Sequence, residues 1–456
     1  MVRRMDPSVA TPRAARARRA RLAARHRGPV ALFAGQAPPR NYPDAPYPFR
    51  ASSHFLYFVG LGLERAVLVI EDGDATVYVV AQDPADELWL GPVPGYDELA
   101  ALVGCDVRPL TELTADRLEG AATLLAVDEA TRLEQRARLG RAPGGPMDDA
   151  LADAVIALRL VHDEAAIAGL RAAAEGTEAA HRAGMAATRV GPREAHVRAA
   201  MEAAMVARGM TPAYGSIVTV HGEVLHNHAY HHPMRDGDLL LCDVGAESRG
   251  GWAGDVTRTW PVSGAFSATQ RTMYELVLSA QRAAIEAVKP GARYRDVHLT
   301  ACRALCRGLV ELGVLRGDVD ELVADGVHAL FFPHGVGHLL GLDVHDMEDL
   351  GDRAGYAPGR ERSAQFGLSY LRLDRDLTPS MAVTIEPGFY QVPAILRDAA
   401  LLDVAGDRLV RDELAKFADV RGIRIEDDVL VTEDGREVLT AGIPKDPEDV
   451  EACASA

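Results

Sequence analysis

Acidic side chains that interrupt strongly apolar stretches constrain this chain more than any other feature. Asp243 follows the run "LLLC", Glu386 follows "VTI", and Glu426 lies inside the alternating stretch "GIRIEDDVLV". Burial of a carboxylate costs several kcal/mol unless a partner compensates its charge. The fold therefore has to bring a cation or hydrogen-bond donors to each of these acids.

A second acid, Asp255, faces Asp243 across a glycine-rich turn in the segment 238–262. If the flanking runs pair as a hairpin centred on Arg249, the two aspartates lie directly opposite each other, with Cβ atoms about 5 Å apart. Gly250 then takes the left-handed position that short hairpin loops favour. Facing carboxylates repel, so they are either a solvated pair at a turn or the two sides of a cation site. The apolar run before Asp243 favours the cation.

The other two acids are also presented by extended segments. Pro387 holds Glu386 in an extended conformation at the end of a strand. Strict alternation in the segment 422–431 places Arg424, Glu426 and Asp428 on one face and Ile423, Ile425 and Asp427 on the other. Glu426 needs a partner on that face, either Arg424 or a metal ion.

The segment "HGVGHLLGLDVHD" carries His334 and His338 at the spacing of a helical metal motif. Three interior glycines disfavour a helix, and the pattern lacks the glutamate of the HExxH motif. In an extended chain His334 and His338 still share a face, whereas His345 points elsewhere unless the chain bends. We expect strand and loop at a site wall, with one imidazole available as a metal ligand.

Four carboxylates and an imidazole exceed what one divalent ion neutralises, so the sequence predicts two ions. Oxygen-rich ligation of this kind suits Mn²⁺, with Co²⁺, Fe²⁺ or Zn²⁺ as alternatives. Two such ions about 3.5–4 Å apart hold a bridging hydroxide and polarise a carbonyl. The predicted reaction is hydrolysis.

Length and charge restrict the class of protein. A chain of 456 residues suits two or three domains. We place a boundary near residue 160, before an Ala-rich helix, and treat residues 1–28, with nine arginines and one acid, as a basic tail and surface helix. The net charge of −17 disfavours nucleic acid and anionic membranes, and no apolar run is long enough to span a bilayer.

The five cysteines are sparse and form no CxxC pair, which predicts no disulfide scaffold and a reducing cytoplasm. Cys302 and Cys306 lie one helical turn apart and are expected to be small core side chains. They belong to a weak internal repeat, in which two helices about a hundred residues apart each follow a proline. The predicted buried positions are Val197, Met201 and Met205 in the first helix and Leu299, Cys302, Leu305, Cys306 and Leu309 in the second.

Six segments occur in an order that resembles the aminopeptidase P and prolidase branch of the pita-bread metallopeptidases. They are "YPFRASSHFLYFVG", "MRDGDLLLCDVGAE", "GDVTRTWPVSG", "HGVGHLLGLDVHD", "IEPGFY" and "GIRIEDD". The resemblance runs from about residue 28 to 440 and implies an α+β fold. A smaller N-terminal α/β domain at 29–160 would precede a pita-bread domain at 161–456, with a pseudo-twofold repeat and a curved antiparallel sheet.

The resemblance also implies roles for individual residues. The metal ligands would be Asp243, Asp255, His338, Glu386 and Glu426, of which Asp255 and Glu426 would bridge two ions. A hydroxide between the ions would attack the carbonyl before proline, and Glu386 would move the proton to the leaving nitrogen. The residues expected to contact substrate or support the metals are His226, His334, His345, Arg424 and Tyr390. Of the five histidines in 221–232, only His226 is expected to be functional, and the others would lie in a solvated loop.

The implied substrate is a peptide with proline at its second position, and the implied assembly is a homodimer or homotetramer. A prolidase, which cleaves Xaa-Pro dipeptides, is the main alternative, and a non-catalytic binding module on the same fold is a remoter one. By comparison with the bacterial members that the chain resembles, the segment 351–376 is expected to be longer and to form a loop over the site.

Overall fold

The computed structural model describes residues 11–42, 44–81, 85 and 87–454 and divides into two compact units. The first unit is formed by the described residues up to Ala165 together with Arg249–Gly251. The second is formed by Ala166–Ser248 and the described residues from Trp252 onward. In the described part of the chain, no helix is both long and apolar enough to cross a membrane.

The first unit is built on a four-stranded sheet in the order β1-β2-β3-β4, antiparallel except for the parallel pair β3 and β4. Its strands are β1 (Val30–Phe33), β2 (Val67–Glu71), β3 (Asp74–Val79) and β4 (Asp106–Pro109). The turn between β2 and β3 consists of Asp72 and Gly73, with φ angles of 51° and 90°. Positive φ at both positions is the type I′ geometry that matches the twist of paired strands.

Helices pack around this sheet. They are α1 (Pro12–Arg25), α2 (Ser53–Val59), α3 (Glu87–Leu90), α4 (Tyr96–Val103), α5 (Glu129–Leu139) and α6 (Pro146–Arg159). The expectation that α1 is a basic surface helix was wrong for two of its arginines. Arg18 is 2% exposed and donates hydrogen bonds to Asp163, while Arg19 is 4% exposed and donates to the carbonyl oxygens of Phe58, Val103 and Gly104. The tail at residues 1–10 lies outside the described residues.

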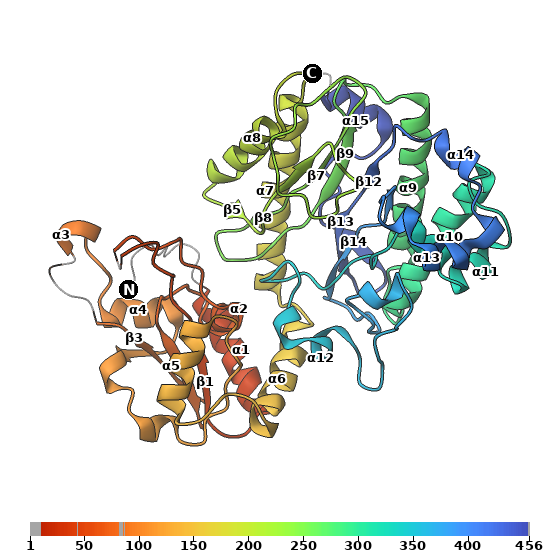
Figure 1. Ribbon diagram of the computed structural model, residues 1–456. Helices are drawn as coiled ribbons and strands as arrows, with labels where there is room; N and C mark the ends of the chain where they lie inside the picture. Colours follow the sequence, from red (N-terminus) through yellow and green to blue (C-terminus); the bar gives the residue numbers. More distant parts are fainter. Residues whose placement is uncertain (1–10, 43, 82–84, 86, 455–456) are drawn as a thin grey trace. The chain divides into compact units, whose positions relative to one another are not determined.

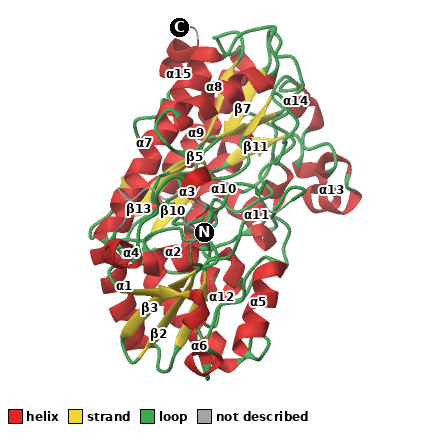
Figure 2. Ribbon diagram, turned by 90° about the vertical axis from the view of Figure 1, so that its left-hand side faces the viewer, coloured by secondary structure: helices red, strands yellow, loops and turns green. Residues whose placement is uncertain are grey.

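The second unit contains four small sheets whose strand pairs are all antiparallel. Its strands are β5 (Thr211–Pro212), β6 (Ile217–Thr219), β7 (Leu239–Asp243), β8 (Ala246–Glu247), β9 (Thr257–Pro261), β10 (Ala382–Ile385), β11 (Gly388–Tyr390), β12 (Gly422–Arg424), β13 (Asp427–Val431) and β14 (Arg436–Val438). Figure 2 shows these strands in yellow, lying among the helices of the unit.

Two pairs of helices enclose the strands of the second unit (Figure 1). The first pair is α7 (Glu164–Ala187) and α8 (Glu194–Val206), and the second is α9 (Ala268–Ala287) and α10 (Tyr294–Glu311). The remaining helices of this unit are α11 (Val319–Ala324), α12 (Asp352–Gly355), α13 (Ala399–Ala405), α14 (Arg411–Ala415) and α15 (Pro447–Ala454). The arrangement confirms the predicted α+β fold with related halves.

The buried positions predicted for the two helices of the internal repeat are confirmed in α8 and partly wrong in α10. Val197, Met201 and Met205 of α8 are all fully buried. In α10 the predicted positions from Cys302 to Leu309 are buried, but Leu299 is only half-buried and His298 is fully buried instead. The buried face of α10 also includes Val297 and Ala301. In the first turns of this helix, the buried positions therefore lie one residue earlier in the chain than predicted.

Candidate metal centre

The four acids identified from the sequence all lie where a strand begins or ends. Asp243 is the last residue of β7, and Asp255 stands two residues before β9. Glu386 lies between β10 and β11, and Glu426 lies between β12 and β13. Asp255, Glu426 and the imidazole of His338 are buried and offer ligand atoms within 4.8 Å of one another.

The predicted register of the hairpin that carries Asp243 and Asp255 was wrong by two residues. Asp243 pairs with Thr257 rather than with Asp255, so the hairpin is centred on Gly250 rather than on Arg249. Gly251, with φ of 86°, takes the left-handed position expected for Gly250. The longer turn shifts Asp255 away from the position directly opposite Asp243.

Both aspartates nevertheless converge on one hydroxyl group. The Tyr214 hydroxyl oxygen lies 2.5 Å from Oδ1 of Asp243 and 2.6 Å from Oδ1 of Asp255. Burial and the charges of the two aspartates raise the pKa of Tyr214 well above its ordinary value, so the phenol stays protonated. Tyr214 was not predicted, because its position in "PAYGSIV" matches no metal-ligand spacing.

Arg424 is paired with Asp243 and not with Glu426. Its Nη2 atom donates to Oδ2 of Asp243 over 2.6 Å, and its Nε atom donates to the Thr257 hydroxyl over 2.9 Å. That hydroxyl in turn donates to Glu426 over 2.7 Å. Of the two partners considered for Glu426, the arginine is therefore engaged with Asp243 and reaches Glu426 only through the Thr257 hydroxyl.

Burial in the absence of a compensating cation perturbs the acids strongly. Burial raises the pKa of Glu386 to about 7. It also raises the pKa of Asp243, and it raises that of Glu426 to well above its ordinary value. Burial also acts against ionised Asp255, but the hydrogen bond and charge of His338 outweigh it and lower the pKa of Asp255. Divalent ions would favour the ionised form of all four acids, so the donor set fits a metal centre.

His338 is the histidine that reaches the acids. Its Nε2 atom lies 3.3 Å from Asp255 and 3.6 Å from Glu386. Its Nδ1 atom lies 2.9 Å from the carbonyl oxygen of Leu339, so Nδ1 carries a proton and Nε2 faces the acids. Burial acts against a charged imidazole, but the hydrogen bond and charge of Asp255 outweigh it and raise the pKa of His338. A bound metal ion would take the place of the proton on Nε2.

His334 and His345 flank His338. The Nε2 atom of His334 lies 2.9 Å from the Tyr390 hydroxyl, which also accepts a hydrogen bond of 3.0 Å from Arg424. The chain bends between 341 and 345, so the ring of His345 comes within 4.2 Å of the His338 ring, centroid to centroid. The segment is not helical, as its glycines predicted.

The glycines of this segment admit neighbouring backbone. A Cβ atom at Gly337, where φ is 153°, would lie 2.2 Å from the carbonyl oxygen of Thr384. A Cβ atom at Gly335 would lie 2.9 Å from the Cα atom of Leu371, which belongs to the segment 351–376. That segment therefore runs against the wall that carries His334.

His226 lies at the accessible edge of the cluster, where partial burial lowers its pKa and the charge of Arg424 lowers it further. The expectation of a solvated loop for the neighbouring histidines was wrong for two of them. The Nδ1 atom of His232 lies 3.0 Å from the buried Glu194, and that of His221 lies 3.0 Å from Glu223. These carboxylates hold the loop in place, and the sequence pattern did not reveal them.

Two family models match the chain. Metallopeptidase family M24 matches residues 168–433, and the aminopeptidase P N-terminal domain matches residues 15–130. The chain belongs to metallopeptidase family M24. Because both models match in this order, this M24 protein belongs to the aminopeptidase P and prolidase branch, as the sequence predicted.

Relatives of this M24 protein span nearly its whole length. It is 34% identical to the Xaa-Pro aminopeptidase of Escherichia coli over 433 residues, covering 90% of each chain. It is 32% identical to the Xaa-Pro dipeptidase of Homo sapiens, covering 93% of this chain and 88% of the human one.

Solved structures of aminopeptidases share its fold. Aminopeptidase PepP of Pseudomonas aeruginosa matches with a TM-score of 0.79 and 32% identity, covering 98% of this chain and 99% of the other. Zinc-substituted E. coli aminopeptidase P in complex with product matches with the same TM-score and identity, covering 98% of each chain. The family implies divalent metal ions, which the donor set described above fits.

Two residues beside the centre were placed correctly by alternation, but their contacts were not predicted. Asp428 accepts a hydrogen bond from the backbone N–H of Asp255 over 3.2 Å. Asp427 points to the opposite face, where Arg258 donates to it over 2.8 Å and Lys445 over 2.5 Å.

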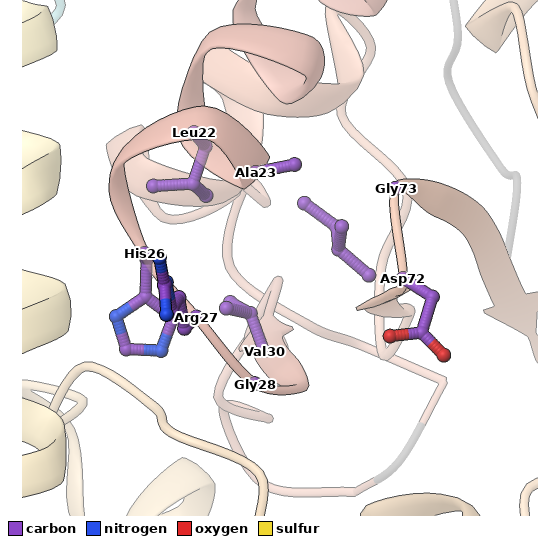
Figure 3. Close-up of a pocket in the computed structure, with 9 residues that line it drawn as sticks. Leu22, Ala23, His26, Arg27, Gly28, Val30, Asp72 and Gly73 are labelled. Atoms are coloured by element: carbon purple, nitrogen blue, oxygen red, sulfur yellow. The ribbon is translucent and has the colours of Figure 1, made fainter.

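An open pocket of about 300 Å³ lies in the first unit, between the end of α1 and the β2–β3 turn (Figure 3). Its lining includes His26, Arg27 and Asp72 and none of the residues of the metal centre. We therefore assign it no part in catalysis.

Proposed function

We propose that this protein is an Xaa-Pro aminopeptidase, a metal-dependent hydrolase that releases the N-terminal residue from peptides with proline at the second position. The observation that carries the proposal is the convergence of buried carboxylates with only partial compensation by Arg424. The five proposed metal ligands are Asp243, Asp255, His338, Glu386 and Glu426. The relative in E. coli with the matching name covers 90% of this chain.

Charge balance supports two divalent ions. The four carboxylates carry one negative charge each and Arg424 carries one positive charge, so three negative charges remain. A single divalent ion neutralises two of these, whereas two ions compensate all three and favour an anionic nucleophile derived from water. We propose Mn²⁺ as the preferred ion, with Co²⁺, Fe²⁺ and Zn²⁺ as alternatives, and we propose Asp255 and Glu426 as the bridging ligands. Bound ions of this kind supply Lewis acidity and lower the pKa of water.

The protein side chains divide the remaining tasks. Glu386 lies between β10 and β11, 3.6 Å from the Nε2 atom of His338, and is proposed to accept a proton from water and return it to the imino nitrogen of the leaving proline. His226, His334 and His345 surround the acids and are proposed to contact the substrate and its developing oxyanion. Arg424 and Tyr390 form a hydrogen-bonded chain to His334, which holds that imidazole in one orientation.

We also propose the division into a basic segment at 1–28, an N-terminal domain at 29–160 and a catalytic domain at 161–456. A cytoplasmic location and a homodimeric or homotetrameric assembly belong to the same proposal. All five cysteines are free, as a reducing compartment requires.

A panel of Xaa-Pro, Xaa-Pro-Xaa and Xaa-Ala-Xaa peptides, assayed with added Mn²⁺ and with chelator, tests the function. We expect cleavage of Xaa-Pro-Xaa that chelator abolishes, and no cleavage of Xaa-Ala-Xaa. Cleavage of the dipeptide alone would instead support the prolidase alternative, for which the human dipeptidase is the relevant relative. No chelator-sensitive cleavage of any peptide would support a binding module.

A further inference from the structure

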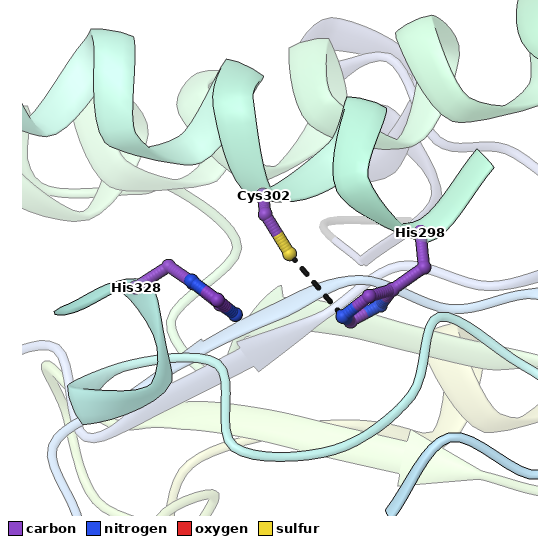
Figure 4. A group of neighbouring side chains, drawn as sticks. All are labelled: His298, Cys302 and His328. Carbon is purple, nitrogen blue, oxygen red and sulfur yellow. Dashed lines mark hydrogen bonds between the residues drawn. The ribbon is translucent and has the colours of Figure 1, made fainter. Parts of the chain in front are cut away.

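A second cluster of metal-ligating side chains lies outside the centre described above. His298 and Cys302 belong to α10, and His328 belongs to the 3-10 helix Val327–Leu330. Their ligand atoms all lie within 4.8 Å of one another, and the three residues are at most 1% exposed. Figure 4 shows His298 and Cys302 projecting from one helix toward His328 on the facing segment.

The imidazoles of this cluster lack hydrogen-bond partners. Among the described residues, no group bonds either ring nitrogen of His328 or the Nδ1 atom of His298. The Nε2 atom of His298 has only a weak contact of 3.4 Å with the sulfur of Cys302. A buried polar group without a partner costs about 1–3 kcal/mol, and folded proteins contain few of them. Three such nitrogens in one place therefore call for a common ligand.

The protonation states favour a cation over an anion. Burial lowers the pKa of His328 to about 4 and that of His298 to well below its ordinary value, so both rings are neutral. A neutral imidazole offers a lone pair to a metal but no charge to an anion. Burial also raises the pKa of the Cys302 thiol, so a bound metal has to displace its proton.

The donor set selects the class of metal. One thiolate and two imidazoles suit Zn²⁺, with bonds of about 2.3 Å to sulfur and about 2.0–2.1 Å to nitrogen, and disfavour Mn²⁺. His298 and Cys302 are four residues apart, which places them on one face of α10. The third donor comes from a separate segment, as in many zinc sites that join two elements.

We propose that His298, Cys302 and His328 bind one Zn²⁺ ion at a site distinct from the candidate catalytic centre. Binding forms a zinc–sulfur bond and two zinc–nitrogen bonds, and the Cys302 proton passes to solvent without any change of oxidation state. A solvent molecule takes the fourth position. The ion joins α10 to the segment that continues from His328 to His334 and His338, so its role is structural.

Cobalt substitution distinguishes this site from the catalytic one. The full-length protein is stripped with chelator and titrated with Co²⁺, and absorption from thiolate-to-cobalt charge transfer is followed in the near ultraviolet. The proposed catalytic ligands are carboxylates and an imidazole, so they produce no such band. Because the two proposed catalytic sites also take up cobalt, we expect the band to reach its plateau by about three cobalt ions per chain. Its final intensity should correspond to one thiolate–cobalt bond per chain, and added Zn²⁺ should remove it.

Variants assign the band to particular residues. Cys302→Ser and His328→Gln should remove or strongly weaken it, while Cys306→Ser, one turn further along α10, should retain it. Circular dichroism establishes that each variant is folded, and if Cys302→Ser does not fold, His328→Gln carries the test because it keeps the thiol. A wild-type protein without the band, a band that survives in both ligand variants, a band lost only in Cys306→Ser, or a band that Zn²⁺ does not displace would overturn the proposal.

Discussion

The hydroxyl oxygen of Tyr214 lies 2.5 Å from the Oδ1 atom of Asp243, and the same oxygen lies 2.6 Å from Asp255. A phenol has one proton, so it donates fully to one carboxylate at a time. The two acids are thereby held side by side on a neutral donor. Tyr214 is thus a positioning residue for the proposed ligands rather than a ligand itself.

Replacing Tyr214 by phenylalanine should weaken metal binding by about 10–100-fold, the usual effect of losing a group that orients metal ligands. The measurement is the Mn²⁺ concentration that gives half-maximal hydrolysis by stripped protein. Tyr230→Phe is the matched control, because the partners of the Tyr230 hydroxyl within the described part of the chain are the Ser216 carbonyl oxygen and a ring nitrogen of His228. Equal Mn²⁺ requirements for Tyr214→Phe and wild type would contradict the positioning role.

Glu426→Gln and Asp255→Asn should reduce turnover by more than about 100-fold, beyond the effect of a residue that only orients ligands. Each substitution removes the negative charge of a proposed bridging ligand while preserving the size of the side chain. Turnover of an Xaa-Pro-Xaa peptide at saturating Mn²⁺ is the measurement, and circular dichroism checks the fold. Glu437→Gln, at an exposed ion pair with Arg171, serves as control. Near-normal turnover in either variant would exclude a bridging role.

Metal removal should destabilise the protein more at high pH than at low pH. In the metal-free protein Glu386 has a pKa of about 7, above the ordinary 4.5, and the pKa values of Asp243 and Glu426 are also raised. A raised folded pKa contributes stability that is complete below the unfolded pKa and is lost as the pH rises through the folded pKa. Bound ions remove this loss because they favour the ionised acids.

The difference in melting temperature between Mn²⁺-loaded and metal-free protein should therefore widen from pH 5.5 to pH 8, roughly the window set by the raised pKa values. Both samples are first stripped with chelator and one is reloaded with Mn²⁺, so that any thiolate site stays in the same state. A difference that is constant or narrows with pH would refute the electrostatic account.

Asp427→Ala should lower the free energy of unfolding by about 3–5 kcal/mol, because it leaves the fully buried Arg258 without its carboxylate. The same change in Glu437, whose partner Arg171 is half exposed, should cost less than about 1 kcal/mol. Urea unfolding of both variants measures the contrast. Similar decreases in the free energy of unfolding for the two variants would show that the buried pair of Arg258 and Asp427 contributes no more to stability than the exposed pair.

The clustering of the acids with His338 was predictable, because the residues next to each one in the sequence indicate on which face of the chain its side chain lies. Alternation placed Glu426 and Asp427 on opposite faces, and the glycines excluded a helix around His338. The register of the hairpin was not predictable, since a turn longer by two residues makes Asp243 face Thr257 instead of Asp255. That choice depends on the φ angle at Gly251, which the sequence "RGG" leaves open.

Residues whose role comes from distant segments were missed. Tyr214 acts through proximity to two strands, and nothing beside it in the chain indicates this. In α10, periodicity placed Leu299 in the core, but the packing of the 3-10 helix at His328 turned His298 inward instead. Local pattern identifies a buried face to within about one residue, and tertiary contacts decide the rest.

The proposed ligands are scattered along the chain, from Asp243 at the end of β7 to Glu426 just before β13. A nascent chain that ends before Glu426 lacks one of the four proposed acids, however much of the second unit it already contains. Contacts between segments so far apart in the chain form late. We therefore expect the full set of proposed ligands to come together only when nearly the whole polypeptide has been synthesised.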